Sequence, residues 1–464
     1  MIDLEKKPTK KGLFVMNQLY QKGMTIKSLR VYFEPYFAGM SRPTANNFFL
    51  FLLAIISMQG IQSVRFLYTW FLKRIDTSGC LNSYYYLLSQ GKISRSLLNQ
   101  ITVRIALSCI PEEYSNYPIF LIIDDTLQPK YGTHFEDYQL VFDHARHNGS
   151  NYLKGHCFVG LVISSVPVEI EGKLRYLSVP VGYRLRSRGE NKLELAANMV
   201  EQAIQEFPTE TKAILLCDSW YPKGAIRRIV SSNPKLELIA NVRVDTKLYD
   251  LPHAPTGKRG RPAKKGRVLD CHLDFDLDTQ IGDYRVGSRK VMTNLFPDPI
   301  YATITTYDSE NSSSYRIFIS TIMPEDILLD DQELETFCPE IPEAERNRLL
   351  PYCLYGFRWA IEVIFYEQKT FWSFGKYMVR SKNGIESYVN FLAIAYSSVQ
   401  LLPFTQKKYA HLKAESSQVK KQLIGMAIQQ EVFFYTFVLS IENRIKSLAI
   451  LKAYEQWVAE KHNF

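Results

Sequence analysis

Four polar residues interrupt an otherwise apolar segment, YGFRWAIEVIFYEQK, at residues 355–369. The segment has the character of a buried helix, yet it contains Tyr355, Arg358, Glu362 and Lys369. At about 100° per residue, these side chains fall within roughly an 80° arc of one helix. Burying them without partners is costly. That face must therefore meet either internal ion pairs or a metal ion and a polyanion.

Two aspartates each end a short apolar run that is predicted to be a buried strand. Asp124 follows PIFLII at 118–123, and Asp218 follows AILLC at 213–217. Packing explains such residues poorly, because Asp is disfavoured in strands. If the two strands are neighbours and the 355–369 helix packs over them, Asp124, Asp218 and Glu362 can converge.

Three converging carboxylates repel one another unless a cation holds them. Oxygen ligands without His or Cys select Mg²⁺ or Mn²⁺. Two such ions about 3.5–4 Å apart can activate a water molecule and stabilise the leaving oxygen of a phosphodiester. Arg358 and Lys369 would then hold phosphates. The alternative is that each Asp caps a turn and that Glu362 makes only surface ion pairs along its helix.

The first aspartate has two candidates, because Asp124 and Asp125 are adjacent. In a strand, adjacent side chains face opposite sides of the sheet. The D-x-T spacing favours Asp124, which shares a face with Thr126. Asp125 stays open as the alternative catalytic residue.

The elements that must position these residues divide the chain into five predicted parts. Residues 1–115 have helix-like apolar segments. Residues 116–244 alternate apolar strands with helices, which indicates a mixed α/β sheet covered on both faces. Residues 245–345 are β-rich and are predicted to be an insertion. Residues 346–400 return to the core with the Glu-bearing helix, and residues 401–464 are predicted to be a C-terminal helical region.

The pattern Y-x2-R-x3-E-x6-K, formed by Tyr355, Arg358, Glu362 and Lys369, resembles the signature of a group of bacterial insertion-sequence transposases with a DDE active site. The IIDDT and LLCD segments resemble the first two aspartate motifs of that family, and the β-rich segment is similar to its inserted domain. The resemblance covers about residues 118–400. It implies an RNase H-like core that uses divalent metal to cut the ends of a DNA element and join them to a target, often through hairpinned ends.

The resemblance also implies roles for particular residues. Asp124, Asp218 and Glu362 would bind two Mg²⁺ or Mn²⁺ ions, and Tyr355, Arg358 and Lys369 would contact phosphates. Trp359 could stack on a base or pack in the core. The implied partners are double-stranded DNA, as element ends and as target, and a second copy of the chain that pairs two ends. Two alternatives are an inactive relative that only binds DNA and a metal-dependent nuclease that cannot join strands.

A basic segment, TGKRGRPAKKGR at 256–267, has six cations and no acid. Its RGRP core resembles an AT-hook, an extended segment that lies in a narrow A·T minor groove. We therefore predict that Lys258, Arg259, Arg261 and Lys264 contact DNA. The alternative is a solvated run of charge between two strands.

The composition of the 464 residues is compatible with this function without requiring it. The hydrophobic share of 46% supports a full core, and a net charge of +9 permits a polyanionic partner. Seven cysteines without a C-x-x-C pair fit neither a zinc site nor a disulfide framework. The longest apolar run, at 48–58, is too short to span a bilayer, so no membrane partner is expected. We expect a bacterial cytoplasmic protein associated with the nucleoid, whose N-terminal helices bind the element ends.

Overall fold

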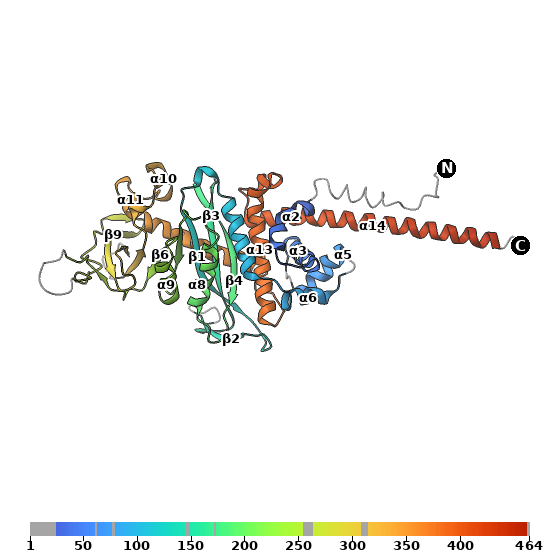
Figure 1. The fold of residues 1–464 in the computed structure, drawn as a ribbon, viewed down its shortest axis with the longest axis horizontal. Helices are drawn as coiled ribbons and strands as arrows, with labels where there is room; N and C mark the ends of the chain where they lie inside the picture. The colour runs from blue at the N-terminus through green and yellow to red at the C-terminus, as the bar shows by residue number, and fades with distance from the viewer. Residues whose placement is uncertain are drawn as a thin grey trace.

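The structure is a computed structural model that describes residues 25–60, 63–76, 79–143, 149–170, 173–253, 263–307 and 314–461. Short N-terminal helices lie beside a large sheet covered by helices, and a long C-terminal helix leaves the body of the molecule (Figure 1). A large cluster of buried apolar side chains joins the N-terminal helices to the sheet.

The N-terminal helices surround one buried helix, α3 (Arg42–Ser57). The side chain of Ser41 accepts a hydrogen bond from the Thr44 amide and so caps α3, and Pro43 occupies its first turn. Nearly every side of α3 is apolar because neighbouring elements cover it. The other elements are α2 (Thr25–Phe33), η1 (Glu34–Phe37), α4 (Val64–Leu67), η2 (Tyr68–Leu72), α5 (Lys73–Ile75), α6 (Leu81–Ser89), α7 (Arg95–Ser108) and η3 (Glu112–Tyr114).

Within the described residues, the central sheet has eleven strands in the order β2-β3-β1-β5-β6-β11-β10-β9-β7, with β4 paired to β3 and β8 to β9. The pairs β1–β5 and β5–β6 are parallel, whereas β1–β3 and β3–β4 are antiparallel. The strands of its first half are β1 (Ile119–Pro129), β2 (Gln139–Phe142), β3 (Tyr152–Ile170), β4 (Lys173–Leu185), β5 (Ala213–Cys217) and β6 (Leu236–Val242).

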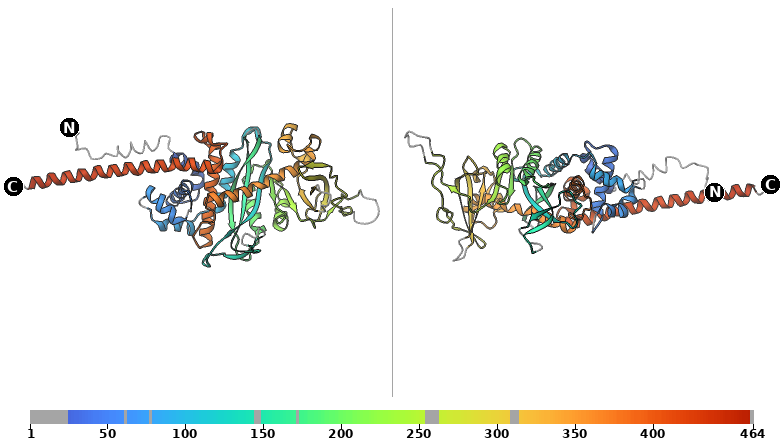
Figure 2. Two further views of the ribbon diagram at one scale, coloured as in Figure 1. Left: turned by 180° about the vertical axis from the view of Figure 1, so that it is seen from behind. Right: turned by 90° about the horizontal axis from the view of Figure 1, so that it is seen from below.

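Helices cover both faces of this half of the sheet. α8 (Lys192–Ile204) and α9 (Gly224–Ser232) lie on one face, and α12 (Trp359–Phe371) crosses the other (Figures 1 and 2). All five residues of β5 are buried, as expected for a strand covered twice. The predicted α/β class is confirmed, and the order β4-β3-β1-β5-β6 is consistent with an RNase H-like core.

The β-rich segment after β6 extends the same sheet. Its last strand pairs antiparallel with β6, with Ile319 beside Ala240. The free edge of the core sheet is therefore covered by the chain's own strands. The strands are β7 (Leu248–Tyr249), β8 (Thr279–Ile281), β9 (Tyr284–Thr293), β10 (Ile300–Tyr307) and β11 (Tyr315–Ser320). The turn η4 (Pro324–Asp326) and the helices α10 (Asp331–Phe337) and α11 (Glu343–Tyr355) follow.

Two long helices complete the chain after α12. α13 (Lys382–Thr405) is buried over most of its length, because it packs against β4 on one side and the N-terminal helices on the other. After η6 (Lys407–Leu412), α14 (Ser417–Lys461) packs on α3 through Ile424, Ile428 and Val432 and then extends away from the body (Figure 2).

Candidate active site

Asp124 and Asp218 lie at the same edge of the sheet, on adjacent parallel strands. The register of β1 and β5 places Ile123 beside Cys217, so the next residue of each segment is an aspartate. The Asp218 carboxylate accepts a hydrogen bond of 3.0 Å from the amide of Trp220. The strand pairing therefore brings together two residues that are 94 positions apart in the sequence.

Glu362 reaches the same place from the first turn of α12. Arg358 connects it to the first aspartate. Its Nη1 lies 2.9 Å from Oδ2 of Asp124, and its Nη2 lies 3.4 Å from Oε1 of Glu362. Asp124, Asp218 and Glu362 all line one cavity of about 1280 Å³.

A glycine in β3 lets α12 approach the sheet at this point. Gly160 pairs with Asp124 across the β1–β3 ladder. A Cβ atom on Gly160 would lie 3.0 Å from the ring of Tyr183 and 3.1 Å from the ring of Phe365, which follows Glu362 by three residues. The missing side chain therefore leaves room for the helix that carries the glutamate.

Residues 355–369 do not form one uninterrupted helix, so this part of the prediction is wrong. α11 ends at Tyr355, the 3-10 turn η5 (Gly356–Arg358) follows, and α12 begins at Trp359. Trp359 is 65% exposed, which excludes core packing as its role. The turn separates Tyr355 from α12, and Arg358, its last residue, contacts Asp124.

The carboxylates perturb one another because they are partly withdrawn from water. Burial raises the pKa of Asp124 to about 8, and the neighbouring charges of Asp218 and Glu362 contribute to this rise, against the lowering effect of Arg358. Burial also raises the pKa of Asp218, opposed by its hydrogen bond from Trp220. A cation between these groups would relieve the repulsion that raises the pKa of Asp124.

Asp125 faces a different set of partners. Its Oδ1 accepts hydrogen bonds from Lys192 Nζ at 2.8 Å and from the Tyr221 hydroxyl at 3.0 Å. The thiol of Cys157 lies 3.4 Å from its Oδ2. Asp125 is thus held by side chains of β3, α8 and the segment after β5, whereas Asp124 points toward Arg358 and Glu362.

A family model described as DDE superfamily endonuclease matches residues 35–274, just over half of the 464 residues. The chain belongs to this endonuclease family. The match contains Asp124 and Asp218 and ends before Glu362. A search of curated proteins gives no match.

The acidic cluster of this endonuclease offers only oxygen donors, which suits Mg²⁺ or Mn²⁺ in kind. In the described part of the chain, however, no three acidic, His or Cys side chains are close enough together to hold a metal ion. Arg358 accounts for this spacing, because its guanidinium takes part in ion pairs with Asp124 and Glu362. The donor set therefore fits a hard divalent cation in its chemistry, and Arg358 supplies the positive charge in this structure.

Cations of the endonuclease line the same cavity as the acids. They are Arg186, Lys192, Lys369 and Lys376. Burial lowers the pKa of Lys369, against the raising effect of Glu362. Tyr355 is partly buried, and burial raises its pKa above the ordinary value. Cations that line the same cavity as the acids can pair with the phosphates of a nucleic-acid backbone that crosses it.

The predicted DNA contacts of the basic segment lie mostly outside the described residues. Lys258, Arg259 and Arg261 belong to the undescribed part at 254–262. Lys264 is described and exposed, in the loop between β7 and β8.

Trp220 and Lys376 are among the residues of this cavity that sequence reasoning missed. Trp220 lies beside the acids, and the Nζ atoms of Lys192 and Lys223 lie 4.2 and 4.4 Å from its ring centre. Lys376 comes from the segment between α12 and α13. Trp220 follows Asp218 by two residues, and this spacing could have predicted that it lies near the acids. Nothing in the sequence near Lys376 predicts its place in the cavity.

Proposed function

We propose that this endonuclease is a transposase of the insertion-sequence group with the Y-x2-R-x3-E-x6-K signature, which cuts the ends of its DNA element and joins them to a target. The supporting observation is that three carboxylates, from β1, the end of β5 and α12, line one cavity together with several cations. Membership of the family implies that the chain cleaves DNA. The joining of strands is what we propose in addition.

In this proposal, Asp124, Asp218 and Glu362 hold two Mg²⁺ or Mn²⁺ ions. Bound ions of this kind activate a water molecule or a 3′-hydroxyl and stabilise the leaving oxygen. We assign the first ligand to Asp124 rather than Asp125, because Asp125 already accepts hydrogen bonds from Lys192 and Tyr221. Asp125 then acts by holding Lys192 at the cavity wall.

The proposed phosphate contacts are Tyr355, Arg358 and Lys369. Arg358 is charge-paired with Asp124 and Glu362 in this structure. Cations bound by the carboxylates would replace that pairing and leave the guanidinium to a phosphate, which it can bind in a bidentate manner. Trp359 is exposed beside it, so its ring is accessible to a base.

The proposed partners are double-stranded DNA and a second copy of the chain, which would meet through the exposed part of α14. Phe434, Ile441 and Leu448 recur every seven residues, and Phe437 and Leu451 follow Phe434 and Leu448 by three. All five are at least 41% exposed. A seven-residue apolar repeat on a lone helix is typical of a helix that pairs with another.

Pairing explains α14 better than a membrane does. By length and composition, this helix could also cross a bilayer. However, Ile424, Ile428 and Val432 of its apolar stretch are buried in the body of the protein, and the part that extends from the body carries Glu442, Arg444, Lys446 and Lys452. Charges within the apolar core of a bilayer are costly, whereas on a paired helix they stay in water. A dimer would also hold two element ends together.

The test uses the DNA that flanks the gene, cloned in a plasmid, with the full chain and Mg²⁺. The wild-type chain should cut at the element ends and join pre-cut ends to a second plasmid. Glu362→Gln should abolish both reactions while it keeps DNA binding. Glu340→Gln, which changes an exposed glutamate of the segment between α10 and α11, is the matched control and should keep both.

Each other outcome identifies a different function. Cleavage without joined product would indicate a nuclease, and DNA retention without cleavage would indicate an inactive relative. Full cleavage by Glu362→Gln would overturn the assignment of the third metal ligand.

A further inference from the structure

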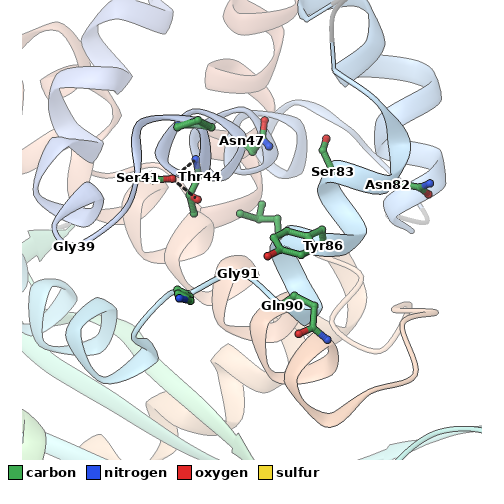
Figure 3. A pocket seen from close by; sticks show the side chains of 12 residues that line it. Gly39, Ser41, Thr44, Asn47, Asn82, Ser83, Tyr86, Gln90 and Gly91 are labelled. Atoms are coloured by element: carbon green, nitrogen blue, oxygen red, sulfur yellow. Dashed lines mark hydrogen bonds between the residues drawn. The ribbon is translucent and has the colours of Figure 1, made fainter.

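A second cavity of about 760 Å³ lies in the N-terminal helices, between the start of α3 and α6 (Figure 3). It shares no lining residue with the acidic cavity. In this view, Tyr86 lies between Thr44 and Asn47 of α3 on one side and Gln90 on the other. From the sequence we expect the N-terminal helices to bind the element ends, but that expectation names no residue of this cavity, so the cavity needs its own explanation.

The polar groups of this cavity are mainly neutral. Its lining contains the primary amides of Asn47, Asn82 and Gln90, the hydroxyls of Ser41, Thr44 and Ser83, one lysine and no acid. Within the described residues, none of these three amide side chains makes a hydrogen bond. Each amide offers both donors and an acceptor. A ligand with its own mixed donors and acceptors matches this lining better than a metal ion or a polyanion.

The cavity also contains an aromatic face. Tyr86 is 64% exposed, although its neighbour Leu87 is buried. An exposed ring beside unpaired amides can contact the flat face or the edge of a nucleobase. Asn and Gln can bind the N6 and N7 atoms of adenine in a bidentate manner, and aromatic rings stack on bases of any sequence. Lys92, at the margin of the lining, can contact an adjoining phosphate.

The helix α6, which carries Tyr86, packs on the hydrophobic core. Tyr84, two residues before Tyr86, is buried, and its ring stacks with that of Phe51 at 6.2 Å. Phe51 in turn contacts Phe391 of α13 at 6.1 Å. Because α13 packs against β4, the cavity is joined to the catalytic sheet through packed helices. Polar groups fixed in this way can discriminate between ligands, since little ordering is needed on binding.

We propose that this cavity reads nucleobases of the DNA end, with Asn47 and Gln90 binding base edges and Tyr86 contacting a base. The inference rests on the proposed function for the identity of the ligand as DNA. It deepens that function by assigning sequence choice to a site separate from the acidic centre.

The test is repeated selection from a random-sequence duplex DNA library with the full chain. The wild type should enrich a motif. Asn47→Ala, Gln90→Ala and Tyr86→Ala should each lose preference at one or two positions, by about 5- to 150-fold per bidentate contact. Their salt dependence should be unchanged, whereas Lys92→Ala should weaken binding to all sequences and lower the salt slope by about one. Gln332→Ala, an exposed amide of α10, is the control and should keep the wild-type motif.

Two results of the selection would overturn the inference. One is a wild-type motif retained at every position by all three cavity variants, with thermal midpoints equal to that of the wild type. The other is a wild type that enriches no motif. Metal-dependent joining of pre-cut element ends to a target plasmid by the same preparation would then show that the proposed function survives. The thermal midpoint of the chain is also measured with free deoxynucleotides and with hexoses, because a carbohydrate is the other ligand class that the neutral lining could bind. Stabilisation by a hexose alone, lost in Tyr86→Ala, would assign the cavity to a carbohydrate and refute base reading.

Discussion

Replacing Asp124 with Asn should make the metal-free protein more stable while it removes a metal ligand. Asp124 has an ordinary pKa of 3.8, and burial with the charges of Asp218 and Glu362 raises it to about 8. At pH 7 the unfolded chain ionises this group, whereas the raised pKa shifts the folded, metal-free chain toward the protonated acid, which can still accept the hydrogen bond from Arg358. At about 1.4 kcal/mol per pKa unit, holding the proton costs at most about 4 kcal/mol. The amide introduced by Asp124→Asn does not ionise in either state, so the variant avoids this cost.

The net gain should be smaller than this limit. The Asp124 carboxylate also accepts a hydrogen bond of 2.9 Å from Arg358, and the neutral amide keeps only part of that interaction. Hydrogen bonds to charged groups contribute about 1.5–3 kcal/mol. We therefore expect Asp124→Asn to raise the free energy of unfolding by about 1–3 kcal/mol at pH 7.

The sign of the pH dependence gives a second measure. An acid with a raised pKa binds more protons in the folded state between pH 3.8 and about 8. Wild-type stability should therefore fall as pH rises through this window, and the advantage of Asp124→Asn should grow. Urea denaturation at pH 5, 6, 7 and 8 with a chelator measures it. Asp298→Asn, in the exposed turn between β9 and β10, is the control and should match the wild type.

The reasoning fails if Asp124→Asn is less stable than the wild type at every pH, or if the two proteins keep a constant difference from pH 5 to pH 8. Addition of Mg²⁺ should reverse the order. A cation bound by the folded wild type stabilises it by mass action, and the variant lacks one carboxylate ligand.

Three further perturbations test the arrangement around the site. Gly160→Ala places a Cβ 3.0–3.1 Å from the rings of Tyr183 and Phe365, so α12 must shift. Plasmid cleavage should fall at least about tenfold. In urea denaturation, the free energy of unfolding should fall by about 1–3 kcal/mol. Lys130→Met leaves the carbonyls of Gly375 and Tyr377 without their donor at 2.7 and 2.8 Å, which should cost about 1–3 kcal/mol in the same assay. Ile441→Glu with Leu448→Glu should make the chain monomeric in sedimentation, whereas Asn443→Glu on the opposite face of α14 should not; an unchanged dimer in the double variant would exclude this helix as the contact.

The chemistry of the candidate site could be predicted because it depends on residue types at short range. An apolar run that ends in Asp marks a strand end, and the spacing of Arg358 and Glu362 follows from adjacent turns of helical chain. These are local properties, so the sequence indicated Asp124, Asp218 and Glu362 together and also indicated the α/β class. The family match covers only the first two acids, which leaves Glu362 to the motif and to the geometry.

Other features depend on contacts between distant segments, and no local pattern encodes them. The exposure of Trp359 depends on how α12 packs on the sheet. The partners of Asp125 come from three separate elements. The pairing of β11 with β6, which makes the β-rich segment a continuation of the core sheet, was equally invisible.

The order of residue types is enough to establish which groups are available: two acids that end apolar strands, one acid on a helix, and the cations beside them. How these groups meet depends on the folded arrangement. The parallel register of β1 and β5 sets Asp124 next to Asp218, Gly160 lets α12 come close enough for Glu362, and Arg358 joins Asp124 and Glu362 by charge. Side-chain type is a property of one residue, whereas repulsion, burial and charge pairing depend on distances that only the packed sheet and helices fix.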